Sequence, residues 1–67
     1  MTEYRIMQMV SSVRKKWQET IYTGTILRLA RLEFATLEKA FPDEYFELIQ
    51  ISHEETCLMF TSKKEAP

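Results

Sequence analysis

Apolar side chains recur at three- and four-residue spacing between Thr25 and Pro42, which is the spacing of one face of an α-helix. Thr25 is the expected cap, because its hydroxyl can accept a free backbone N–H of the first turn. Pro42 pushes the preceding residue out of the helical region and so ends the helix. The predicted stripe consists of Ile26, Leu27, Ala30, Phe34, Leu37 and Phe41. Such a helix must bury this stripe on another element.

Segments on both sides of the helix are rich in strand-forming residues, covering residues 4–10, 17–23, 45–51 and 56–61. Solvated turns are expected between them, and Gly24 is expected to let the backbone turn into the helix. The sequence therefore predicts a small α+β domain of ββαββ order, with one helix packed on one face of an antiparallel sheet. Residues 1–67 are expected to form a single domain with a frayed tail at residues 62–67.

Residues 6–21 also allow a second interpretation, since their apolar positions fit a helical stripe that would end at Gly24. The stripe would contain Ile6, Met9, Val10, Val13, Trp17 and Ile21. The protein would then be a small all-α bundle. The run from Thr20 to Thr23 opposes this alternative, because its β-branched and aromatic side chains lose rotamer freedom in a helix.

Composition is that of an ordinary globular chain, with 45% hydrophobic and 28% charged residues and a net charge of −1. No apolar run approaches the roughly 20 residues that span a bilayer, and no signal peptide is visible, so no membrane partner is expected. Cys57 is the only cysteine. A cytoplasmic, reducing setting is therefore expected.

The charges are divided unevenly along the chain. Residues 1–31 carry six basic and two acidic side chains, whereas residues 32–62 carry one basic and seven acidic side chains. Such polarity can orient a protein on a partner. The alternative is that the two halves neutralise each other in the fold.

Catalytic and metal sites are not expected. Cys57 and His53 are the one candidate nucleophile and base, but the acidic neighbours Glu54 and Glu55 oppose formation of a thiolate. A structural zinc site needs two pairs of Cys or His, and the sequence has no second pair. Gly24 is the only glycine, so a Gly-rich phosphate loop is excluded. We expect no enzymatic activity, no cofactor and no metal.

A surplus of apolar strand residues favours protein binding, because one helix covers only one face of a sheet. We expect Ile6, Ile21, Phe46, Leu48, Leu58 and Phe60 to face the helix. The opposite, open face would then carry Met7, Met9, Tyr22, Tyr45, Ile49, Cys57 and Met59. Exposed apolar patches mark interaction surfaces, and Met and Tyr are favoured in them. The alternative is that twist and a register bulge bury part of both faces.

The helix suggests a further contact patch for an acidic, partly apolar partner, formed by Arg28, Arg31 and Leu32. Cations are disfavoured near the positive end of a helix. No acidic residue lies three or four positions away to compensate them. The alternative is that Glu44 or Glu47 reaches these arginines in the fold.

Nucleic-acid binding is the alternative function, carried by Arg14, Lys15, Lys16 and Trp17, where three cations adjoin a ring on which a base could stack. Against it stands the acidic net charge of the chain, since most nucleic-acid-binding domains are basic. The structural explanation of the same residues is that Trp17 packs in the core while the charges stay in water.

The leading hypothesis is a non-enzymatic module that occupies the surface of a larger protein or of a second copy. In architecture it resembles the compact inhibitors and regulators that phages and mobile elements encode, which often use one sheet and one helix to block a host enzyme. The likeness rests on architecture, and no motif assigns the chain to a family. Self-association through the open sheet face or an edge strand fits the same pattern.

Overall fold

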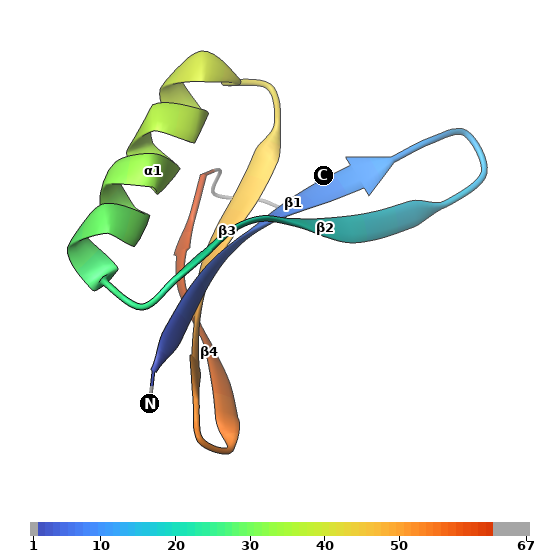
Figure 1. Cartoon of the computed structure of the whole chain (residues 1–67). Helices are drawn as coiled ribbons and strands as arrows, with labels where there is room; N and C mark the ends of the chain where they lie inside the picture. Colours follow the sequence, from blue (N-terminus) through green and yellow to red (C-terminus); the bar gives the residue numbers. More distant parts are fainter. Residues whose placement is uncertain (1, 63–67) are drawn as a thin grey trace.

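One antiparallel sheet and one helix make up the computed structural model, which describes residues 2–62. Its elements are β1 (Glu3–Ser11), β2 (Lys16–Gly24), α1 (Leu27–Ala40), β3 (Tyr45–Ser52) and β4 (Glu55–Thr61). The strand order is β2-β1-β3-β4, and α1 lies across one face of the sheet (Figure 1). The predicted ββαββ fold is confirmed. The all-α alternative is wrong, because residues 16–24 form a strand that pairs with β1 from end to end.

Short turns close both hairpins where the sequence predicts them. In the β1–β2 turn, the Ser12 N–H donates to the Lys15 carbonyl at 2.8 Å, and the Ser12 hydroxyl oxygen accepts from the N–H groups of Arg14 and Lys15. Ser52 pairs with Glu55 at the β3–β4 turn. These local hydrogen bonds favour strand pairing of residues 3–24 over a continuous helix.

The start of α1 differs from the prediction. Ile26 occupies the N-cap position in an extended conformation, and no side chain caps the helix. Thr25 lies one residue before the cap, so the predicted role of its hydroxyl is wrong. The end agrees better, since α1 stops at Ala40 and the Phe41 N–H closes the last turn on the Leu37 carbonyl at 2.9 Å.

Gly24 is needed for space rather than for a special backbone angle. Its φ is not positive. A Cβ atom at this position would lie 2.7 Å from the Tyr22 hydroxyl oxygen and 3.0 Å from its ring. The absent side chain therefore makes room for Tyr22, which packs against the core.

The core is small and sits where the two central strands pass under the helix. Ile6 of β1 and Phe46 and Leu48 of β3 are completely or almost completely buried. Ala30 and Phe34 cover them from α1. These three strand residues were predicted to face the helix, and the prediction is confirmed.

Two bulges change the faces of the outer strands. The β1–β2 register shifts between Ile6 and Met7, and the β3–β4 register shifts between Leu48 and Ile49. An extra residue reverses the alternation of side chains beyond it. Tyr22 therefore pairs with Ile6 and packs on the helix side, contrary to prediction.

The second bulge, at Met59, has the same effect on β4. Leu58 pairs with Ile49 and so lies on the open face, whereas Cys57 pairs with Gln50 and lies on the helix side; both were predicted on the other face. Phe60 keeps its predicted side, with its ring centroid 6.4 Å from that of Phe34.

The tail begins in an ordered way. Ser62, the first residue expected to fray, donates its N–H to the Phe46 carbonyl at 3.0 Å and accepts the Phe46 N–H on its hydroxyl oxygen at 2.8 Å. The remaining residues of the predicted tail, 63–67, lie outside the described residues. Within residues 2–62, no helix is long and apolar enough to cross a bilayer.

Candidate interaction surfaces

The open face of the sheet is less exposed than the sequence predicts. Met7, Met9 and Ile49 lie there, as alternation from Ile6 and Leu48 requires, but each is half-buried. Tyr45 is only 6% exposed. No helix of residues 2–62 covers this face, so neighbouring side chains on the bulged strands provide the cover. The exposed apolar area on this face is therefore smaller than the sequence predicts.

Polar contacts add to this cover. The Tyr45 hydroxyl donates to Glu47 at 2.9 Å. Burial raises the pKa of Tyr45 above its usual value of 10.0, and the hydrogen bond to Glu47 and the charge of that carboxylate raise it further. The Thr20 hydroxyl lies 3.3 Å from the Met7 sulfur. The polar groups of these side chains therefore have partners within the chain itself.

The first turns of α1 carry more exposed apolar surface. Leu32 is 65% exposed, Ile26 51% and Leu29 44%. Arg28 and Arg31 lie on the same turns, and a shallow hollow there is lined by Leu27, Arg28, Leu29, Arg31 and Leu32. We call Ile26, Arg28, Leu29, Arg31 and Leu32 the helix surface. The structure thus brings together the three helix residues that the sequence predicts and adds two apolar ones.

Ile26 and Leu29 were missed for different reasons. Ile26 was assigned to the buried stripe, but it precedes the first helical residue and so leaves the stripe. Leu29 lies off the stripe, and the 100° rotation per residue of an α-helix places it beside Leu32. Helical geometry alone could have identified Leu29, but it could not have identified Ile26.

The arginines of the helix surface have no acidic partner among residues 2–62. The two carboxylates of the alternative interpretation form hydrogen bonds elsewhere: Glu44 accepts from Gln8 at 3.0 Å, and Glu47 accepts from Tyr45 at 2.9 Å. The first turn of α1 contains no acidic residue. Arg28 therefore adds its charge to the positive end of the helix, and Arg31 adds a second positive charge one turn further along.

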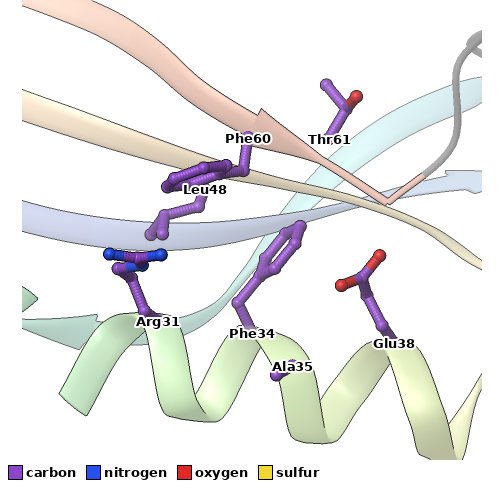
Figure 2. A pocket seen from close by; sticks show the side chains of 7 residues that line it. All are labelled: Arg31, Phe34, Ala35, Glu38, Leu48, Phe60 and Thr61. Atoms are coloured by element: carbon purple, nitrogen blue, oxygen red, sulfur yellow. The ribbon is translucent and has the colours of Figure 1, made fainter. Parts of the chain in front are cut away.

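A groove separates α1 from β4 and continues the helix surface toward the sheet. It is lined by Arg31, Phe34, Ala35, Glu38, Leu48, Phe60 and Thr61. Figure 2 shows Arg31 reaching from the helix toward Phe60, with Phe34 projecting between the helix and the sheet. The Arg31 guanidinium carbon lies 5.3 Å from the centroid of the Phe60 ring, within cation–π range.

The basic residues of the alternative function gather at the β1–β2 turn, which projects away from α1 (Figure 1). Arg14, Lys15 and Lys16 are exposed and Trp17 is half-buried. Trp17 does not join the core, contrary to the structural explanation of this motif. The Lys15 ammonium lies 5.4 Å from the centroid of the Trp17 ring, whose N–H donates to Glu19 at 2.9 Å.

His53 and Cys57 are both exposed on the β3–β4 hairpin. In the part of the chain that the structure describes, no three His, Cys, Asp or Glu side chains are grouped so that they could hold a metal ion. Comparison with family models, with curated proteins and with solved structures finds no match for this chain. The candidate surfaces are therefore judged from the charge, exposure and contacts of their residues.

Proposed function

We propose that this chain is a protein-binding module that acts by placing its helix surface on a larger, acidic and partly apolar protein. The observation that carries the proposal is the start of α1. An apolar, half-exposed Ile26 stands where a capping side chain is favoured, and Arg28 stands in the first turn, where acidic residues are favoured. Local rules broken together at one end of a helix are typical of functional sites.

The chemistry of the helix surface defines the partner. Carboxylates are attracted by the two arginines and by the positive end of the helix dipole. Leu29 and Leu32 contribute apolar area that is released from water on contact. An acidic surface with apolar side chains between its charges fits both. Blocking or regulating a larger protein, as phage and mobile-element inhibitors do, is the action proposed for this module.

Capture from a lysate by the immobilised chain tests this proposal when matched variants are compared. The double variant Arg28→Glu/Arg31→Glu reverses the charge of the surface, and Leu29→Ser/Leu32→Ser removes its apolar part. Lys39→Glu is the control, since it reverses an exposed charge near the other end of the same helix. We expect an acidic protein that is captured by the wild type and by the control and is lost with both double variants. Capture that neither double variant weakens would contradict the proposal.

Nucleic-acid binding by the β1–β2 turn is a second candidate, favoured by the position of Trp17 outside the core. Its test is a salt titration with a single-stranded oligonucleotide. The logarithm of affinity should fall with the logarithm of salt with a slope of about −0.7 for each phosphate neutralised. The variant Arg14→Ala/Lys15→Ala/Lys16→Ala should remove that dependence. Binding that is indifferent to this variant would exclude the turn as the site.

A further inference from the structure

The side of α1 that borders the groove carries two opposite charges, two turns apart. Arg31 and Glu38 both line the groove, and Phe34 projects between them (Figure 2). They are seven residues apart, so helical rotation returns them to the same side of α1, about 10.5 Å apart along its axis. Ala35 lies between them on this side and is exposed. We call Arg31, Ala35 and Glu38 the charged flank.

Neither charge of this flank is neutralised within the part of the chain that the structure describes. The ion pairs of residues 2–62 involve neither Arg31 nor Glu38. The contact of Arg31 with the Phe60 ring holds the guanidinium beside the groove, but it supplies no negative charge. Each of the two side chains can therefore still form an ion pair with another molecule.

We propose that the charged flank binds the same flank of a second copy, with the two α1 helices antiparallel around a twofold axis. The axis passes between Phe34 and Ala35, which is the midpoint between Arg31 and Glu38. Arg31 of each copy then meets Glu38 of the other copy, so a single twofold operation forms two identical ion pairs.

The second copy is the occupant because the charged flank carries both signs. An acidic protein that extended along it would pair with Arg31 but would bring its carboxylates close to Glu38. A basic protein would pair with Glu38 and be repelled by Arg31. A second copy in antiparallel orientation offers both opposite charges, in the required order and at the required spacing.

The neighbouring residues agree with this pairing. The small side chain of Ala35 lies next to the axis, so the helices can approach to the roughly 8–10 Å that separates packed helices. Phe60 is 40% exposed and lies beside Arg31, so the dimer removes apolar area from water in each copy. Arg28 lies one turn before Arg31 and brings a second cation toward Glu38 of the other copy.

The inference goes beyond the proposed function and shares one residue with it. Arg31 belongs to both the helix surface and the charged flank, so an acidic partner and a second copy would compete for it. Leu29 lies about 160° around the helix from Arg31, away from the dimer contact. Glu38 lies outside the helix surface, so Glu38→Arg tests the dimer without changing the surface that binds the larger protein.

Sedimentation equilibrium of the purified full-length chain tests the pairing. The wild type should change with concentration from the 8.0 kDa monomer to twice that mass. Arg31→Glu and Glu38→Arg should each raise the dimer dissociation constant at least about tenfold, since each replaces two attractions by two repulsions. Glu33→Arg is the control and should leave the constant unchanged. It makes the same change of charge at an exposed position about 140° around the helix from Glu38.

Exchange of the two charges tests the register. In Arg31→Glu/Glu38→Arg both ion pairs form again with their signs reversed, so the dissociation constant should return to within about threefold of the wild-type value. This variant should fold, because the helix dipole favours an acidic residue toward the start of α1 and a basic residue toward its end. An equimolar mixture of the two single variants should form a heterodimer, which an affinity tag on one of them detects.

Three results would overturn the proposal. The first is a wild type that stays monomeric at every concentration, as it would if this flank bound only a foreign protein. The second is a dimer that tolerates both single variants, because its contact would then lie elsewhere. The third is a double variant that dimerises as weakly as the single ones. None of these results affects capture of an acidic protein through Leu29 and Leu32, which tests the proposed function separately.

Discussion

The two edge strands of this sheet, β2 and β4, differ in how well their side chains protect them from pairing with another chain. β2 carries Lys16 and Glu19, and its polar side chains are engaged: Gln18 donates to Glu47 at 3.4 Å, and the Thr20 hydroxyl contacts the Met7 sulfur. β4 carries one charge at its first residue and an apolar run after it. One edge strand is thus polar and engaged in side-chain contacts, whereas the other presents apolar side chains to water.

The position of the helix adds to the difference. α1 packs on β2 as well as on the central strands, but a groove separates it from β4. The helix surface and β4 share one property, since each breaks a rule that stabilises an isolated domain. The two surfaces meet at Arg31 and Phe60, whose cation–π contact bridges the groove. The helix surface and the exposed side chains of β4 therefore adjoin each other in the molecule.

The largest effect is expected from β3, one of the two central strands. Phe46→Ala removes the largest fully buried side chain, so it should lower the free energy of unfolding by about 3–5 kcal/mol. That is comparable to the whole stability of a domain of this size, so both hairpins should be lost together. Urea unfolding followed by circular dichroism measures it.

Leu58→Ser is the matched change on the open edge. It should alter stability by less than about 0.5 kcal/mol, because the Leu58 side chain is already 56% exposed. Equal losses from the two variants would show that β4 is part of the core.

The protection of β2 can also be removed by substitution. Gln18→Val/Glu19→Leu removes a polar contact and the central charge of β2, so this edge should begin to pair. Compared with the wild type, the double variant should tighten self-association about tenfold, or about 1.4 kcal/mol. Light scattering over a concentration series measures the change. Unchanged self-association would show that something other than these side chains protects β2.

A smaller effect is expected at the uncapped start of α1. Ile26→Ser supplies the missing cap and should add about 1 kcal/mol to the free energy of unfolding. For a domain of this size that corresponds to a rise in Tm of about 4–8 °C. Thr25→Ala is the control and should change Tm little, since Thr25 does not cap the helix. If Thr25→Ala were the more destabilising change, the described start of the helix would be incorrect.

The smallest effect concerns the open face between the two edges. Because the pKa of Tyr45 is raised in the folded state, folding favours its neutral form. This stabilisation is complete below the ordinary pKa of 10.0 and is lost as the pH rises through the folded pKa. Thermal melting from pH 8 to 11 should therefore show a steeper loss of stability for the wild type than for Tyr45→Phe. Equal slopes would mean that Tyr45 is solvated.

Much of the fold could be predicted from local patterns. The spacing of Ala30, Phe34 and Leu37 identified the helix, and the run from Thr20 to Thr23 correctly favoured a strand over the rival helix. Arg28, Arg31 and Leu32 line one hollow on α1, as helical rotation predicts, while their role in binding stays a prediction. Tyr22, Leu58 and Cys57 were placed on the wrong faces, because a bulge depends on the partner strand and leaves no mark in the alternation of a single strand.

The element types, their order and the central core residues follow from side-chain period and turn chemistry within short windows of the chain. Other features became clear only from the folded chain: β2 and β4 form the edges, the helix begins uncapped at Ile26, and Tyr45 is buried on the face expected to be open. Those outcomes depend on contacts between residues far apart in the chain, which no local pattern encodes. The same long-range contacts decide which apolar side chains remain for a partner.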